Sequence, residues 1–282
     1  MSDYYITNKE NGDLIDIKDY PSIELISSLH DIFLLDGINE YRKNLDTYDF
    51  LGTPVPRVSN ILRECIAKEY LMNWAARLGV KGYIAERNKA TTIGSRVHEM
   101  IEHFLLYKED KELPFSSSTN ISKSIDNAYE NFKLWYSNMM KLGYTIEIIA
   151  IEKRVSCPYY GGTIDCIARI NGKVYIIDFK TSKSISYEYI IQTCAYMWNV
   201  NNGYAPDLPH IDGIGIIRVD KEKKGIFEDY FLNEHIPYQR EIINQFFMGF
   251  GALLASYYHN INMRFIFSKY KSVYNIEESV TK

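Results

Sequence analysis

Cysteine is scarce in this chain of 282 residues, which has four, at positions 65, 157, 166 and 194. No two of them have the Cys-x-x-Cys spacing that is typical of many zinc and redox sites. Secreted scaffolds that rely on disulfides have a much higher cysteine density. The sequence therefore predicts reduced thiols and excludes a disulfide framework.

Long apolar runs are also absent. The longest stretch without a charged residue, an amide side chain or a histidine, residues 246–258, is shorter than the roughly 20 residues that a membrane-spanning helix needs. The chain begins Met-Ser-Asp-Tyr-Tyr, without the basic and apolar segments that a secretory signal requires. We therefore expect a cytoplasmic protein with no membrane partner.

The chain has no strong excess of either charge. Its 32 basic and 36 acidic residues give a formal net charge of −4. Such a balance provides no overall attraction for nucleic acid, so any phosphate binding has to come from a local groove. The apolar content of 46% is enough for a large core, in one domain or in one domain with an appendage.

The periodic segments predict an α/β protein. Residues 1–53 combine strand-like pieces at Tyr4–Ile6 with a helical pattern over 22–35, and a proline-rich break at 53–56 follows. Ser59 is the expected N-cap of the next helix, and Gly79 the expected end of the helix after it. Further helices are expected around His98, over 122–141, around Gln192 and over 237–258, with a loop at 116–120 and strands over 146–155, 162–170, 173–180, 213–219 and 225–232.

Two of these strands are joined by Asn171-Gly172, a two-residue loop that favours a type I′ hairpin. Such a loop pairs Ile170 with Lys173, and the same register sets Asp165 opposite Asp178. Directly opposed residues have Cβ atoms only about 4.5–5.5 Å apart, and like charges in such pairs destabilise a sheet. A divalent cation is the natural partner for the two carboxylates.

Lys180 projects from the same face of its strand as Asp178, because strand side chains alternate. A solvated hairpin end is the simpler interpretation of these charges. However, the apolar run over residues 174–177 is typical of a buried strand, so the charges are expected at the rim of a core.

These residues resemble the PD-(D/E)XK nucleases, and in particular their RecB-like exonuclease branch. In that branch a helix carries a histidine, one strand carries G-x-x-D, the next carries D-x-K, and a later helix carries Q-x-x-x-Y. The chain has these motifs in the same order, at His98, Asp165, Asp178 with Lys180, and Gln192 with Tyr196. The similarity covers residues 54–200, and residues 56–62 resemble the opening segment of phage and mitochondrial genome-maintenance exonucleases of this type.

The resemblance implies a restriction-endonuclease-like core, with a central mixed β-sheet flanked by helices, over residues 54–282. Residues 1–53 would form an N-terminal appendage with helical structure. A bacterial cell or a phage-infected host cell is the implied setting.

The resemblance also implies a site for one or two Mg²⁺ ions, with Mn²⁺ able to substitute. Its ligands would be His98, Asp165, Asp178 and the backbone carbonyl of Phe179. A helix histidine without this context is more often structural. Glu152 either completes the site through a bound water or forms an ion pair with Lys153 or Arg154.

The family comparison implies that Lys180 orients or deprotonates the attacking water. Gln192 and Tyr196, at i and i+4 on one helix face, would contact DNA or support Lys180, unless they only pack. Gly94 would leave room for a close backbone approach, while Glu102 either pairs with a basic residue or is solvated. The implied additional DNA contacts are Ser95, Arg96 and Thr181.

The expected function is a metal-dependent DNA exonuclease that produces 5′-phosphates in recombination, repair or phage DNA metabolism. A structure-specific or restriction-like endonuclease and an inactive DNA-end-binding protein are the alternatives. The expected partners are single- or double-stranded DNA ends, with a helicase or a single-strand annealing or binding protein; the chain has no G-x-x-x-x-G-K-[ST] motif of its own, and its oligomeric state is open.

No iron–sulfur cluster is expected, because cluster-containing relatives have three cysteines downstream of the Q-x-x-x-Y helix and none follows Cys194 here. Near the C-terminus, basic residues alternate with aromatic ones. This stretch would stack on single-stranded bases or form an ordinary amphipathic tail. It contains Arg264, Phe265, Phe267, Lys269, Tyr270 and Lys271.

Overall fold

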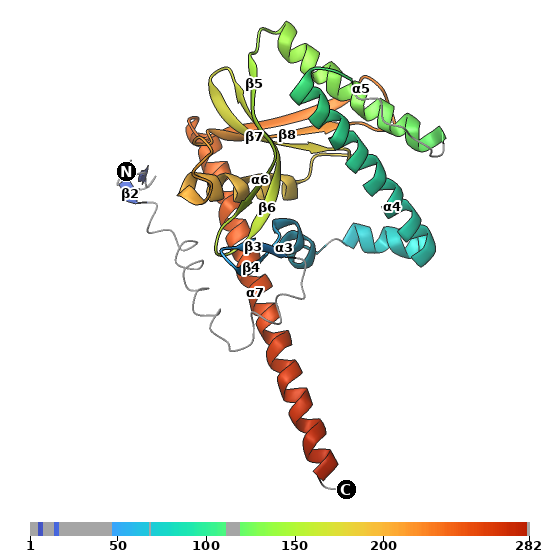
Figure 1. The fold of residues 1–282 in the computed structure, drawn as a ribbon, viewed down its shortest axis with the longest axis vertical. Coiled ribbons are helices and arrows are strands. Elements are labelled where there is room, and N and C mark those ends of the chain that lie inside the picture. Colours follow the sequence, from blue (N-terminus) through green and yellow to red (C-terminus); the bar gives the residue numbers. More distant parts are fainter. Residues whose placement is uncertain (1–4, 8–13, 17–46, 68, 111–118, 281–282) are drawn as a thin grey trace. The chain divides into compact units, whose positions relative to one another are not determined.

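The computed structural model describes residues 5–7, 14–16, 47–67, 69–110 and 119–280 (Figure 1). The described residues form two compact units, one within 1–66, 156–161 and 247–282 and the other within 67–155 and 162–246. The hairpin of β3 (Thr47–Phe50) and β4 (Thr53–Pro56) spans position 53. The expected division of the chain at that position stays a prediction.

The second unit is built on a mixed sheet with the strand order β5-β6-β7-β8-β9. Strands β6 and β7 are antiparallel, β7 and β8 are parallel, and β8 and β9 are antiparallel. The predicted α/β fold with a central mixed sheet is therefore confirmed. The strands are β5 (Ile146–Ser156), β6 (Gly161–Ile170), β7 (Lys173–Lys180), β8 (Gly213–Val219) and β9 (Phe227–Asn233).

The β6–β7 hairpin has the register that its loop predicts. Ile170 pairs with Lys173, and the pairing continues as far as Cys166 opposite Ile177. Asn171 and Gly172 have φ angles of 47° and 82°, both in the left-handed region that a type I′ turn requires. Asp165 and Asp178 come directly after the last of these pairs, and β7 continues through Lys180 in its pairing with β8.

Helices cover both faces of this sheet (Figure 1). α4 (Glu69–Tyr107) and α5 (Thr119–Lys141) share one buried cluster with alternate residues of β6, β7 and β8. Phe179 is in that cluster, where its ring meets Phe132 edge-on at 5.6 Å. Because strand side chains alternate, Asp178 and Lys180 face the other side, towards α6 (Tyr187–Asn199), which continues into the π-helical turn η2 (Val200–Tyr204).

The predicted helix boundaries are largely confirmed in this unit. Gly79, with φ 66° and ψ 170°, interrupts α4 at the expected position. The helix predicted over residues 122–141 begins three residues earlier, at Thr119. Most of the loop expected at 116–120 and the helical pattern over 22–35 lie outside the described residues.

The first unit contains α3 (Val58–Cys65) and the distal part of α7 (Pro237–Val280). The expected N-cap at Ser59 is wrong: Arg57 is the N-cap, and its carbonyl accepts hydrogen bonds from Asn60 and Ile61 at 3.0 and 3.1 Å. Helix α7 packs Phe250 against Tyr160, with ring centroids 4.8 Å apart. It continues well past residue 258, because neither glycine nor proline follows Gly251 to end it.

Short antiparallel strands β1 (Tyr5–Thr7) and β2 (Leu14–Asp16) agree with the strand-like pattern near the N-terminus. In the C-terminal stretch, Arg264 Nη1 lies 3.8 Å from Glu64 Oε2, which is compatible with an amphipathic tail. Across the described ranges, no helix has the length and apolar character that a bilayer span requires.

Candidate active site

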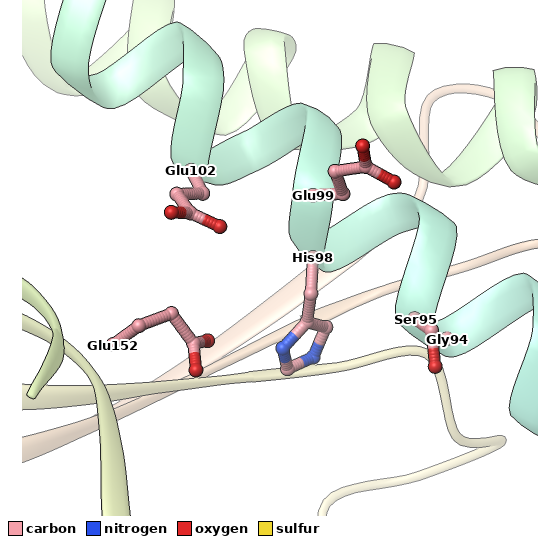
Figure 2. Close-up of a pocket in the computed structure, with 6 residues that line it drawn as sticks. All are labelled: Gly94, Ser95, His98, Glu99, Glu102 and Glu152. Carbon is pink, nitrogen blue, oxygen red and sulfur yellow. The ribbon is translucent and has the colours of Figure 1, made fainter. Parts of the chain in front are cut away.

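A pocket of about 470 Å³ opens beside the His98 turn of α4. Figure 2 shows the carboxylate of Glu152, from β5, pointing towards the imidazole of His98. Glu102 lies on α4, the helix that carries His98. Gly94, Ser95 and Glu99 complete the lining. The pocket therefore has an acidic wall and one imidazole, a composition suited to a cation.

Three of the neighbouring side chains converge closely enough to share one metal ion. His98, Glu152 and Asp165 each offer a ligand atom, and these atoms all lie within 4.8 Å of one another. His98 Nδ1 lies 3.6 Å from Asp165 Oδ2. The other oxygen-rich neighbour, Asp178, is not part of this group.

The tautomer of His98 follows from its second contact. Nε2 lies 2.8 Å from the backbone carbonyl oxygen of Phe179, and a carbonyl can only accept a hydrogen bond. Nε2 therefore carries a proton, and Nδ1 is the nitrogen that faces the Asp165 carboxylate. The Phe179 carbonyl, expected as a metal ligand, here uses one of its lone pairs to orient the histidine.

Glu152 has an unusual backbone for a strand residue, with a φ of 48°. A left-handed conformation at a non-glycine residue costs about 1–3 kcal/mol, and such strain often accompanies functional sites. Partial burial and the Asp165 carboxylate raise the pKa of Glu152, against the opposing effect of His98. Among the described residues no ion pair joins Glu152 to Lys153 or Arg154, and the Lys153 ammonium pairs with Asp207 instead.

Asp178 and Lys180 form a nearly buried ion pair. Lys180 Nζ lies 2.8 Å from Asp178 Oδ1 and 2.7 Å from Oδ2, and 3% of Asp178 is exposed. Burial raises the pKa of Asp178, and the neighbouring Asp165 adds to this effect while Lys180 opposes it. Burial favours the neutral form of Lys180, but the Asp178 and Asp165 charges outweigh it and raise the pKa of the ammonium.

Two further contacts fix the ends of these strands. Asp165 Oδ2 accepts a hydrogen bond of 2.9 Å from the backbone N–H of Phe179. Lys180 Nζ lies 4.8 Å from the centroid of the Tyr189 ring on α6, a cation–π contact. The carboxylate of one strand is thus held against the backbone of the next, and the ammonium is held under an aromatic ring.

The Q-x-x-x-Y residues and the G-x-x-D glycine belong to one packing arrangement. Gln192 Nε2 donates to the hydroxyl of Tyr196 at 3.3 Å. A Cβ added at Gly162 would lie 2.3 Å from the Tyr196 ring, so only glycine fits beneath it. Tyr196 is 4% exposed and packs on the strand that carries Asp165, while direct contact of these residues with DNA stays a prediction.

The remaining predicted residues surround the pocket. Ser95 lines it, Arg96 Nη1 pairs with Glu99 Oε2 at 2.8 Å, and Thr181 lies at the end of β7. A Cβ added at Gly94 would lie 3.7 Å from Thr181 Oγ1, which is an ordinary contact. The expectation that Gly94 is needed for a close backbone approach is therefore wrong.

Three lysines that the sequence did not indicate lie close enough for their charges to interact. Burial lowers the pKa of Lys221, and the charges of Lys89 and Lys183 lower it further. Arg218 Nε donates to the Ser182 carbonyl at 2.8 Å, which holds the segment of Lys183 in place. Asn127 Nδ2 donates to the Lys221 carbonyl at 3.2 Å, which holds the turn between β8 and β9. These lysines lie on three separate elements, and no spacing in the sequence connects them.

A mixed sheet with Asp165 on β6, an Asp178-x-Lys180 motif at the end of β7 and a histidine facing them from a helix is the arrangement that the PD-(D/E)XK motifs predict. The chain is a distant homologue of human mitochondrial genome maintenance exonuclease 1, and its motifs are similar to those of the RecB-like exonuclease branch of the PD-(D/E)XK nucleases. The two sequences are 25% identical over 173 residues, which cover 52% of this chain and 44% of the human protein. The aligned part thus spans less than half of that relative.

No family model matches the chain. Among solved structures, it is similar to a phage-related exonuclease from Haemophilus somnus 129PT, with 14% identity, a TM-score of 0.33, and coverage of 75% of this chain and 96% of that one. A second similar structure, SSO0001, has 15% identity, a TM-score of 0.23, and coverage of 54% and 74% respectively.

Proposed function

We propose that this protein is a Mg²⁺-dependent deoxyribonuclease, an exonuclease that hydrolyses phosphodiester bonds to leave 5′-phosphates. The observation that carries the proposal is the convergence of His98, Glu152 and Asp165 next to the Asp178–Lys180 pair. The homology to a human protein named as an exonuclease supports it. A role in DNA recombination, repair or phage DNA metabolism would follow, with a helicase or a single-strand annealing or binding protein as partner.

The donor set fits a small divalent cation. Octahedral Mg²⁺ binds oxygen at about 2.0–2.1 Å, which sets adjacent ligand atoms about 3 Å apart and opposite ones about 4.2 Å apart. The atoms of His98, Glu152 and Asp165, all within 4.8 Å, reach such spacings after small side-chain rotations. Mn²⁺ should replace Mg²⁺, because it accepts an imidazole ligand more readily.

Asp178 is suited to a supporting place in the same centre. Although Lys180 Nζ is 2.7 Å from its Oδ2, this buried oxygen receives no well-directed hydrogen bond from the described residues. Asp178 Oδ2 therefore has a lone pair available, and because it lies next to Asp165 it could also coordinate the cation. The proposed ligands are therefore His98, Glu152, Asp165 and Asp178.

A bound divalent cation lowers the pKa of a coordinated water and neutralises charge on the scissile phosphate. The chain's own residues then have separable tasks. Lys180, held as an ammonium by Asp178 and by the Tyr189 ring, orients the water. Lys89, Lys183 and Lys221 offer positive charge for the phosphates of the bound strand.

The test is a cleavage assay on linear DNA labelled at either end, with Mg²⁺, Mn²⁺, Ca²⁺ or excess EDTA. We expect release of nucleotides from ends with Mg²⁺ or Mn²⁺, little turnover with Ca²⁺, and none with EDTA. His98→Ala should lower the rate strongly, because the Nδ1 ligand is lost, while Glu99→Gln, which changes a pocket residue outside the convergent group, should have a small effect.

The alternatives give different results in the same assay. Cleavage of a circular single strand would indicate an endonuclease. Binding of DNA ends without cleavage under any metal condition would indicate an inactive end-binding protein. Undiminished cleavage in excess EDTA would contradict the metal-dependent proposal.

A further inference from the structure

A second group of metal-ligating side chains lies at the opposite end of the sheet. Asp212 immediately precedes β8, and Glu234 and His235 follow β9. Each offers a ligand atom, and these atoms all lie within 4.8 Å of one another. The Asp212 carboxylate accepts a hydrogen bond of 2.7 Å from Val174 at the start of β7, whereas Asp178 and Lys180 lie about 13 and 20 Å further along that strand at 3.3 Å per residue.

His210, which contacts Glu234, extends this group of three to two imidazoles and two carboxylates. His235 Nε2 lies 2.5 Å from Asp212 Oδ1, and His210 Nε2 lies 2.6 Å from Glu234 Oε1. A nearby cation, Lys173 Nζ, is 3.8 Å from Asp212 Oδ1. Two neighbouring chain segments therefore contribute one imidazole and one carboxylate each.

Backbone contacts fix the relative positions of the two segments. The N–H of Glu234 donates to the Asp212 carbonyl at 2.9 Å, and the N–H of Asp212 donates to the Val174 carbonyl at 2.8 Å. The Asn233 side chain accepts a bond of 2.9 Å from the N–H of His235. The ligand-bearing residues are thus held in place by the sheet end, independently of any ion.

Exposure in this group differs between the two kinds of ligand. The side chains of His210 and His235 are 46% and 48% exposed, against 18% for Glu234 and 15% for Asp212. The carboxylates form the base of the group, and the imidazoles close over it from the solvent side. An ion can therefore enter from solvent, and the histidines can rotate to meet it.

We propose that His210, Asp212, Glu234 and His235 bind one Zn²⁺ ion. Two imidazoles and two carboxylates make a four-ligand set that is typical of zinc, whereas Mg²⁺ and Ca²⁺ prefer oxygen ligands alone. The ion links the start of β8 to the end of β9. It would leave no open position for substrate, so its role is structural.

Zinc coordination needs only small rearrangements here. With bonds of about 2.0–2.1 Å, tetrahedral ligand atoms are about 3.3 Å apart. The two imidazole–carboxylate pairs, now at 2.5 and 2.6 Å, would open by less than about 1 Å, and the ligand atoms of Asp212, Glu234 and His235, which all lie within 4.8 Å of one another, would move closer together. The Lys173 ammonium, which is half-exposed, would move into solvent.

The experiment separates this site from the candidate nuclease centre. Full-length protein with Glu152→Gln and Asp165→Asn, which removes two ligands of that centre, is titrated calorimetrically with Zn²⁺. We expect one equivalent to bind, His235→Ala in this background to weaken binding at least tenfold, and His259→Ala, a change of an exposed histidine on α7, to have no effect. Zn²⁺ should also raise the melting temperature of the background and His259→Ala proteins but not of His235→Ala.

The His210→Gln variant provides a second readout if His235→Ala folds poorly, since His210 lies at the surface and contacts the group through one bond. Equal zinc affinity in the background protein and in both histidine variants would overturn the proposal. So would the absence of binding in the background protein. The four residues would then form two histidine–carboxylate hydrogen bonds only.

Discussion

Lys180 and Asp178 depend on each other, and their coupling can be measured. Asp178 is 3% exposed, so Lys180→Met leaves a buried carboxylate without its cation. We expect a loss of about 3 kcal/mol in the free energy of unfolding of the metal-free protein, the lower end of the cost for a broken buried pair, because the Lys180 side chain keeps 20% exposure. The double variant Lys180→Met/Asp178→Asn should recover much of that loss, while cleavage stays abolished in both.

The pH dependence of the single variant has a definite sign. Without Lys180, burial and Asp165 raise the pKa of Asp178 further above its unfolded value. An Asp178 carboxyl with a raised pKa binds its proton more tightly in the folded state than in the unfolded state. The free energy of unfolding of the variant should therefore fall as the pH rises from about 5 to about 8. Urea unfolding at both pH values checks this, and additive costs of the two single substitutions would show that the pair is not coupled.

At the scale of elements, two motif glycines should respond to alanine in opposite ways. A Cβ at Gly162 would lie 2.3 Å from the Tyr196 ring, so Gly162→Ala should cost about 1–3 kcal/mol of stability by overpacking. A Cβ at Gly94 would have only an ordinary contact at 3.7 Å within a helix, so Gly94→Ala should stabilise the fold by about 0.5–1 kcal/mol.

Thermal unfolding of both alanine variants measures the contrast. Tyr196→Ala, which removes the ring above Gly162, should make Gly162→Ala far less costly in the double variant. Equal and additive effects of the substitutions would show that the glycine and the tyrosine do not share one packing arrangement.

Local chemistry explains which elements the sequence could predict. The Asn171-Gly172 turn defines the hairpin register, and Gly79 interrupts α4, because both effects arise within a few residues. The cap of α3 was misplaced by two residues, since Arg57 begins the helix through its backbone carbonyl and has no side-chain signature. The extension of α7 beyond residue 258 was missed for a related reason: no residue there signals a helix end.

The residues of the candidate site also differ in whether local sequence could predict them. His98, Asp165, Asp178 and Lys180 occur in motifs with fixed spacing, so the sequence indicates them. The gathering of Lys89, Lys183 and Lys221, and that of His210 with Glu234, depends on which loops the sheet brings together. Such tertiary neighbours leave no periodic signal in the chain.

Because the net charge is −4, the proposed DNA binding has to depend on a few local cations. Lys221→Gln should reduce the salt dependence of DNA affinity by about 0.7–0.9 in the slope of log K against log salt, the value for one lost phosphate contact. Lys141→Gln is the matched control, because this exposed lysine is ten residues, about 15 Å, beyond the Asn131 that anchors the Lys221 turn.

Fluorescence anisotropy with labelled DNA in Ca²⁺, at several salt concentrations, measures both slopes. Unchanged slopes in Lys89→Gln, Lys183→Gln and Lys221→Gln would show that these lysines do not contact phosphate. Loss of slope in Lys141→Gln as well would indicate a diffuse effect of net charge.

The bond between His98 and the Phe179 carbonyl has a consequence for the order of folding. Asp165 meets the backbone of Phe179 across 14 residues of chain, within one hairpin, whereas His98 meets the same residue across 81. Short loops close faster and with less entropy than long ones, so the hairpin brings the two aspartates together before α4 docks. We therefore expect the two carboxylates to come together first and His98 to join them only when the core has formed, so that the proposed metal site would be complete only in the finished fold.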